Sequence, residues 1–171
     1  MMTDIRDLAA SIRLVIFDVD GVFTDGRLVY SAQGEEIKVF HVRDGVGIKA
    51  LRRAGIELAV ISGRSSDAVA LRMAELGIKR VYQGDHDKLP LFDKLLAESA
   101  VTAEQTAFVG DDLPDLPVLQ RVGLAACPAD AHEAVRAVCH WVGSKDGGRG
   151  AVREFCDFLL GCIPQAAGRE R

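Results

Sequence analysis

The stretch VIFDVDG, residues 15–21, ends a short apolar run on two aspartates and a glycine. An apolar run of this length, rich in β-branched residues, is typical of a buried β-strand. Side chains two positions apart in an extended segment face the same side. Asp18 and Asp20 are therefore expected to present both carboxylates to one ligand where the strand ends. The alternative for either residue is an ordinary turn former or helix cap.

Composition limits the classes of protein that the chain can belong to. It has 171 residues, 49% of them hydrophobic and 27% charged, which is enough apolar material for one domain over 1–171. The net charge is −4 and no basic block occurs, so nucleic acid and anionic membranes are not expected partners. No apolar run approaches the roughly 20 residues of a membrane span. Residues 1–13 carry acids early and no long apolar core, so we expect no secretory signal and a cytoplasmic location.

Strand-like and helix-like segments alternate along the chain. A hairpin is expected over 27–42, with its turn near Gln33 and Gly34. Asp44 is expected to cap the next helix, and the helix over 66–77 to bury Ala68, Leu71 and Leu76. The four cysteines form no C-x-x-C pair and are expected to be buried free thiols. Strands are predicted at 13–17, 57–62, 79–83, 106–110, 124–128 and 139–142, and helices at 45–55, 66–77, 88–100, 114–123, 129–138 and 150–163.

This alternation predicts an α/β fold, a Rossmann-like doubly wound parallel sheet with helices on both faces. Ligands of such folds bind at the carboxyl ends of the strands. Polar residues from four separate segments meet at that edge. They are Asp18 and Asp20 after the first strand, Ser62, Gly63 and Arg64 after the second, Lys88 at the start of a helix, and Asp111, Asp112 and Asp115 after the fourth.

The chemistry of this set favours a phosphate and a metal ion. Several carboxylates at one sheet edge repel each other strongly without a cation, and oxygen-only ligands suit Mg²⁺. A serine hydroxyl and a lysine ammonium beside that cation suit a phosphate group. Taken singly, Ser62 is expected to be a helix cap and Lys88 a solvated helix residue. The prediction of a phosphate and metal site therefore depends on the combination of these residues with the carboxylates.

Four motifs in order, DVDGVFTDG, ISGR, GDHDK and GDDLPDLP, resemble those of the haloacid dehalogenase-like superfamily. The second aspartate of D-x-D is similar to that of its phosphatases and phosphomutases. The spacing between motifs leaves no room for a cap domain. The resemblance implies that Asp18 is the nucleophile and that Asp20 is the general acid and base. It further implies that Mg²⁺ binds to Asp18, Asp111 and the backbone carbonyl of Asp20, with Asp112 and Asp115 holding the metal's water molecules. Ser62, Gly63 and Lys88 are then expected to bind the phosphate.

A longer set of motifs, including VRDGVGIKALRRAGI and GGRGAVREFCDFLL, resembles one capless family within this superfamily. Those phosphatases release the eight-carbon sugar acid Kdo from its 8-phosphate, for lipopolysaccharide. The resemblance implies a homotetramer built through the hairpin at 27–42, with each site completed by a neighbour, and a tail at 145–171 that folds over the site through Arg149. Arg64 stands where related phosphatases of nine-carbon sugar-acid 9-phosphates typically have glutamate, so the resemblance favours the eight-carbon substrate and implies that Arg64 binds its anionic groups; the alternative is a salt bridge that holds the loop.

Three alternatives remain: a nine-carbon sugar-acid phosphatase, a broad-specificity sugar phosphatase, and a non-catalytic oligomerisation module. The last has no physical need for the acidic cluster. Pro114 departs from the polar residue that relatives often show, but proline is compatible with a helix start.

Overall fold

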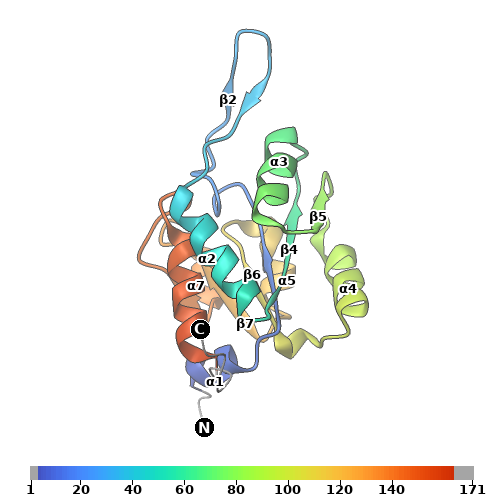
Figure 1. Cartoon of the computed structure of the whole chain (residues 1–171), viewed down its shortest axis with the longest axis vertical. Coiled ribbons are helices and arrows are strands. Elements are labelled where there is room, and N and C mark those ends of the chain that lie inside the picture. Colours follow the sequence, from blue (N-terminus) through green and yellow to red (C-terminus); the bar gives the residue numbers. More distant parts are fainter. Residues whose placement is uncertain (1–3, 164–171) are drawn as a thin grey trace.

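The computed structural model describes residues 4–163, whose centre is a six-stranded parallel sheet (Figure 1). The strands lie in the order β5-β4-β1-β6-β7-β8, as expected for a doubly wound fold with its first strand at the centre. Their bounds are β1 Leu14–Phe17, β4 Glu57–Ser62, β5 Arg80–Gln83, β6 Thr106–Val109, β7 Leu124–Cys127 and β8 Trp141–Val142.

Helices cover both faces of this sheet. Residues of α1 (Ile5–Ala10), α2 (Val42–Arg53), α3 (Asp67–Leu76) and α7 (Ala151–Cys162) share one apolar core. Residues of the helices on the other face build the second core. These helices are α4 Lys88–Ser99, α5 Leu116–Leu119 and α6 Glu133–Val138, and two 3₁₀ turns lie at η1 Ala103–Gln105 and η2 Leu113–Asp115. The predicted α/β fold is thus confirmed, although α1 had no clear signal in the sequence.

Strand β1 explains why the site lies where it does. Its four side chains are fully buried, Val15 and Phe17 in one core and Leu14 and Ile16 in the other. Phe17 is in register with a residue of β4 on one side and a residue of β6 on the other. The segments that follow these three strands therefore begin at the same edge of the sheet.

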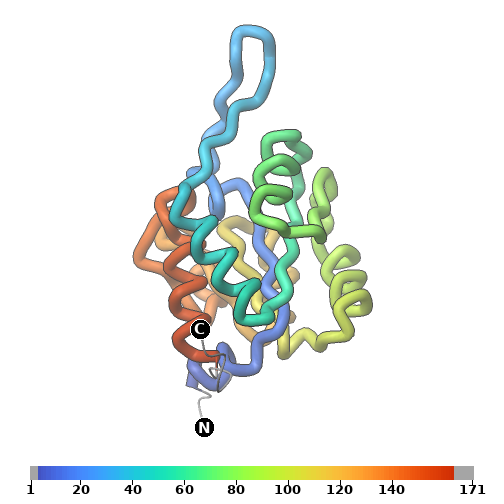
Figure 2. Tube along the Cα trace, in the orientation of Figure 1, coloured from blue at the N-terminus to red at the C-terminus, as the bar shows by residue number. Residues whose placement is uncertain are grey.

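The hairpin after β1 is present and stands away from the body of the molecule (Figures 1 and 2). It consists of β2 (Val29–Tyr30) and β3 (Glu36–Ile37), only two residues each, and Gly34 turns with a positive φ of 85°. Leu28, Val29, Tyr30, Ile37 and Val39 are exposed on it, whereas Phe40 packs against the core. No cap domain accompanies the hairpin in the described part of the chain.

Two local predictions were wrong. Asp44 does not cap α2: His41 does, and Asp44 lies buried inside the helix, where its carboxylate accepts the backbone N–H of Arg153 from α7 (3.0 Å). Of the three residues predicted to be buried in α3 only Leu76 is, because Leu71 is 66% exposed and Ala68 is partly exposed; α3 buries Val69 and Met73 in their place. A helical face is set by the surface that it packs against, and apolar spacing alone left two faces of α3 open.

The cysteines are all free thiols, with Cys127 and Cys156 buried and the other two partly buried. Among the described helices, none combines the length and the apolar character needed to cross a bilayer.

Candidate active site

A cavity of about 280 Å³ opens at the carboxyl edge of β1, β4 and β6. It collects every residue that the sequence placed at this edge, and three that were not predicted there: Gly26, His86 and Pro114. Its lining consists of Asp18, Asp20, Gly26, Ser62, Gly63, Arg64, His86, Lys88, Asp111, Asp112, Pro114 and Asp115.

Asp18 lies at the centre of the site, one residue after β1. Its backbone N–H donates to the carbonyl of Val109 (2.9 Å), so the strand hydrogen bonding continues to this residue and fixes its position. Its side chain is nearly buried, and Oδ1 lies 3.0 Å from Nζ of Lys88. Burial, and then the neighbouring Asp115, raise the pKa of Asp18 to about 7, because water no longer stabilises the charged form.

Lys88 is the buried cation of the site. It is the first residue of α4, only 4% of its side chain is exposed, and Nζ donates to Oδ1 of Asp115 over 2.6 Å. Burial by itself lowers the pKa of Lys88, but Asp18 and Asp115 outweigh it and the pKa lies above its ordinary value. The lysine is therefore charged at neutral pH and available to an anionic ligand.

Asp111 carries the clearest indication that the site can hold a cation. One oxygen each of Asp18, Asp111 and Asp115 lies within 4.8 Å of the other two. Oδ1 of Asp111 is buried and has no hydrogen-bond partner, and burial together with Asp18 raises the pKa of Asp111 to about 8. Carboxylate oxygens so arranged fit a hard divalent cation such as Mg²⁺.

Asp115 and Asp112 play different structural parts. Asp115 uses Oδ1 for Lys88, and its Oδ2 accepts the backbone N–H groups of Asp111 (2.9 Å) and Asp112 (3.3 Å). Asp115 thus fixes the loop that carries Asp111. Asp112 lines the cavity from its rim and accepts the N–H of Leu113, and Pro114 starts the 3₁₀ turn η2 as proline can.

Ser62, the last residue of β4, brings a buried hydroxyl to the cavity. Its Oγ accepts the backbone N–H of Arg64 over 3.4 Å. Between them, Gly63 lies under the imidazole of His86, and a Cβ there would come within 2.8 Å of Nδ1. A larger residue at this position would have to displace the exposed His86 ring.

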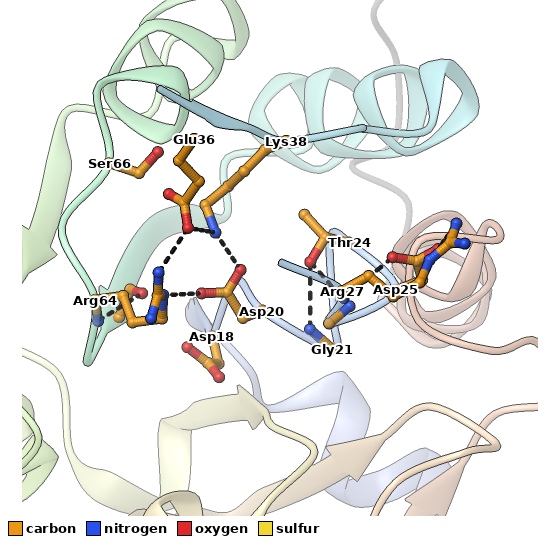
Figure 3. Close-up of polar contacts among 12 residues, drawn as sticks. Asp18, Asp20, Gly21, Thr24, Asp25, Arg27, Glu36, Lys38, Arg64 and Ser66 are labelled. Carbon is orange, nitrogen blue, oxygen red and sulfur yellow. Dashed lines mark hydrogen bonds and ion pairs between the residues drawn. The ribbon is translucent and has the colours of Figure 1, made fainter. Parts of the chain in front are cut away.

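Asp20 faces a different set of groups from Asp18 (Figure 3). Its Oδ1 accepts from Nζ of Lys38 at 2.5 Å, and its Oδ2 lies 3.7 Å from Nε of Arg64. Oε1 of Glu36 lies 2.7 Å from Arg64 and 3.5 Å from Lys38. The four side chains form a closed ring of alternating charge, and two of them, Glu36 and Lys38, come from the hairpin.

Four residues at or near the site were not predicted from the sequence: Glu36, Lys38, His86 and Gly26. The signal for the first two lay in the spacing: residues 36 and 38 are two apart in an extended segment, as Asp18 and Asp20 are. His86 and Gly26 lie within the motifs GDHDK and DVDGVFTDG, but no spacing distinguished them from the other residues of those motifs.

Arg149 does not line the cavity. Its side chain is mostly exposed and lies 3.7 Å from Asp25, which also pairs with Arg27. The glycines before it pack on the loop after β1: a Cβ at Gly147 would lie 1.9 Å from the carbonyl oxygen of Gly21. The GGRG segment thus contacts a loop of the site, while the binding role of Arg149 remains a prediction.

The carboxyl edge of this parallel sheet carries Asp18, Lys88 and Asp111, which follow one another in this order along the chain. This arrangement is typical of one family of hydrolases. The chain belongs to the haloacid dehalogenase-like hydrolase family, whose model matches residues 34–123.

Within that family, the chain is similar to the 3-deoxy-D-manno-octulosonate 8-phosphate phosphatases called KdsC. It is 48% identical to KdsC of Yersinia pestis, over 92% of this chain and 84% of the relative. It is 46% identical to KdsC of Escherichia coli K12, over 97% of this chain and 90% of the relative. The structure of the Moraxella catarrhalis phosphatase, in complex with a magnesium ion, a phosphate ion and KDO, matches with a TM-score of 0.92 and 40% identity, covering 95% of this chain and 94% of that one.

Proposed function

We propose that this chain is a Mg²⁺-dependent phosphatase that hydrolyses 3-deoxy-D-manno-octulosonate 8-phosphate to Kdo and inorganic phosphate. The observation that carries the proposal is the buried cluster in which Asp18, Lys88 and the unpartnered oxygen of Asp111 meet. This cluster offers a nucleophile, a cation for phosphate and a carboxylate for a metal within one cavity. The names of the relatives supply the sugar acid.

The first chemical step transfers the phosphoryl group to the enzyme. A carboxylate oxygen of Asp18 attacks phosphorus in line, and the bond between phosphorus and the sugar's oxygen breaks. Lys88 and the hydroxyl and N–H groups at Ser62 and Gly63 bind the non-bridging phosphate oxygens. Asp20 gives its proton to the leaving sugar oxygen, so that an alcohol departs and an aspartyl phosphate remains.

The second step returns the enzyme to its starting state. Asp20, now a carboxylate, takes a proton from a water molecule that attacks the same phosphorus atom. The bond between phosphorus and the Asp18 oxygen breaks, and inorganic phosphate leaves. Asp20 has then regained its proton and Asp18 is again a free carboxylate.

The metal site uses oxygens of the same two loops. Asp18, Asp111 and the backbone carbonyl of Asp20 would hold Mg²⁺, which neutralises charge between the nucleophile and the phosphate when bound. The hydrogen bond from the Asp111 N–H to Asp115 supports a role for Asp115 in orienting the Asp111 loop, and Asp112, which lines the cavity, would contact the metal's water molecules.

We further propose that the enzyme is a cytoplasmic homotetramer assembled through the hairpins at 27–42. Five apolar side chains are exposed on an element that is too short to be stable alone. Burial of such side chains contributes roughly 1.5–3 kcal/mol each. A neighbouring subunit would cover both the hairpin and the open side of the site, which has no cap domain. Part of the tail at 145–171, residues 164–171, lies outside the described residues.

The experiment that tests this function is phosphate release from a panel of sugar-acid phosphates with Mg²⁺. We expect the eight-carbon 8-phosphate to be preferred over nine-carbon 9-phosphates, and Asp18→Asn to lose roughly 10⁴-fold or more in kcat. The fold should survive, because a neutral amide replaces a carboxylate that burial already disfavours. Asp25→Asn, at a partly exposed residue of the same loop that does not line the cavity, is the matched control and should keep its activity. A panel without preference, or an active Asp18→Asn, contradicts the proposal.

A further inference from the structure

Lys38 is an unusual lysine for a hairpin that stands away from the body. Only 2% of its side chain is exposed, although the hairpin's apolar residues on either side of it, Ile37 and Val39, face outward. The alternation follows the two-residue period of an extended segment, so the inward positions are those of Glu36, Lys38 and Phe40. The hairpin thus directs a buried ammonium into the site.

A buried ammonium has to be compensated by carboxylates, and the ring around Asp20 provides two of them. Nζ of Lys38 lies 2.5 Å from Asp20 and 3.5 Å from Glu36, so the contact with Asp20 is the closer one. Glu36 also accepts a hydrogen bond from Arg64. Glu36 and Asp20 therefore each lie near both cations, Lys38 and Arg64. The ring of Figure 3 therefore joins two basic side chains to two carboxyl groups, and one of these, Asp20, is the group that carries the transferred proton in the first chemical step.

These contacts fix the orientation of the Asp20 carboxyl group. Lys38 donates a hydrogen bond to Oδ1, and Arg64 lies near Oδ2, and the two basic residues come from different segments of the chain. The Lys38 contact is a short hydrogen bond, whereas 3.7 Å to Arg64 is beyond hydrogen-bond distance and leaves Nε of Arg64 without a partner. Lys38 is thus the stronger of the two constraints on Asp20.

We propose that Lys38 is a positioning residue for the reaction: it holds the Asp20 carboxyl group where it can reach the leaving sugar oxygen. This rests on the proposed function, in which Asp20 is the general acid and base. General acid catalysis depends on geometry, and a misplacement of about 1 Å can cost on the order of 10²-fold in rate. The hairpin would then position a catalytic group, in addition to its proposed role in assembly.

The test compares two leaving groups with different needs for a proton. A sugar alkoxide leaves poorly without one, whereas 4-nitrophenolate leaves readily. We expect Lys38→Met to lower kcat/KM for the eight-carbon 8-phosphate about 30- to 100-fold, and for 4-nitrophenyl phosphate less than about 3-fold. The ratio kcat/KM is the right quantity because it covers the steps up to the first bond cleavage.

Two further variants separate positioning from a structural role. Arg27→Met removes a cation of the same hairpin, one that pairs with Asp25. This variant should change kcat/KM for neither of the two substrates. In an Asp20→Asn background, Lys38→Met should add less than a twofold loss, because a residue that acts through Asp20 has nothing left to position. Lys38→Gln, which keeps a hydrogen-bond donor, replaces the methionine variant if that one does not fold.

The outcomes distinguish this inference from the function beneath it. Equal losses for both substrates in Lys38→Met, or an additive loss in the double variant, overturn the positioning role and leave the phosphatase intact. If Asp20→Asn itself loses no more on the sugar phosphate than on 4-nitrophenyl phosphate, the assignment of Asp20 fails and the role of Lys38 falls with it.

Discussion

Replacing Lys88 by methionine takes a buried ammonium away from Asp18 and Asp115 while keeping most of the length of the side chain. The wild-type lysine lies 3.0 Å and 2.6 Å from these two carboxylates and is 4% exposed. Removing one partner of a buried ion pair typically costs about 3–5 kcal/mol, because the remaining charge stays buried without compensation. For a chain of this size, about 2–4 °C per kcal/mol then gives a melting temperature lower by roughly 6–20 °C.

The pH dependence of this loss has a definite sign. Burial raises the pKa of Asp18 to about 7 and that of Asp111 to about 8, far above their values in an unfolded chain. Between about pH 4 and these values the folded protein binds more protons than the unfolded one. The contribution of these carboxyl groups to the free energy of unfolding therefore decreases as pH rises through that window. Lys88 offsets the charge that forms. The variant should therefore be least destabilised near pH 6 and most destabilised near pH 9.

The assay is thermal denaturation of metal-free protein at pH 6 and pH 9. The matched control is Lys94→Met on the same helix α4, because Lys94 is 54% exposed and lies 3.8 Å from Glu98. A surface pair of this kind is worth about 0–1 kcal/mol. If Lys88→Met melted within about 2 °C of the control at pH 9, the three carboxylates would not depend on this lysine, and the reasoning about their charge would be wrong.

The remaining predictions concern the metal and the assembly. Protons compete with Mg²⁺ for Asp18 and Asp111, so the Mg²⁺ affinity measured by calorimetry should weaken as pH falls from 8.5 to 6, and activity removed by EDTA should need more metal to return at pH 6. A pH-independent affinity would contradict the raised pKa values. The double variant Ile37→Glu, Val39→Glu should dissociate the proposed tetramer in sedimentation velocity and weaken the preference for the eight-carbon substrate. Leu71→Glu, at an exposed apolar residue of α3, is the control. A wild-type monomer with full preference would count against shared sites.

Much of the site could be predicted because its residues follow strands. Asp18, Ser62 and Asp111 come just after or at the end of buried runs, and parallel strands bring their carboxyl ends to one edge. Lys88 followed from its place at the start of the next helix. In each case the position in the sequence determined the position in the fold, without knowledge of side-chain packing.

The wrong or missing parts depend on contacts between distant segments. Asp44 looks like a helix cap, but α7 packs on α2 and supplies a backbone N–H to its carboxylate. Leu71 is apolar at a helical spacing, yet nothing in the described chain covers it. Lys38 lies in a hairpin whose inward face depends on where Asp20 and Arg64 are. Local patterns carry no information about these partners.

The central place of β1 has a consequence for the order of events during synthesis. The strand lies between β4 and β6 with all four of its side chains buried, and these partners, Glu57–Ser62 and Thr106–Val109, leave the ribosome much later. At roughly 5–20 residues per second, the strand waits for several seconds with both of its edges open, a state in which strands pair with other chains. Asp18 likewise exists long before Lys88 and Asp111. The nascent chain therefore cannot complete its cavity until the second neighbour of β1 has emerged, and the first appearance of phosphatase activity would report that the middle of the sheet has closed.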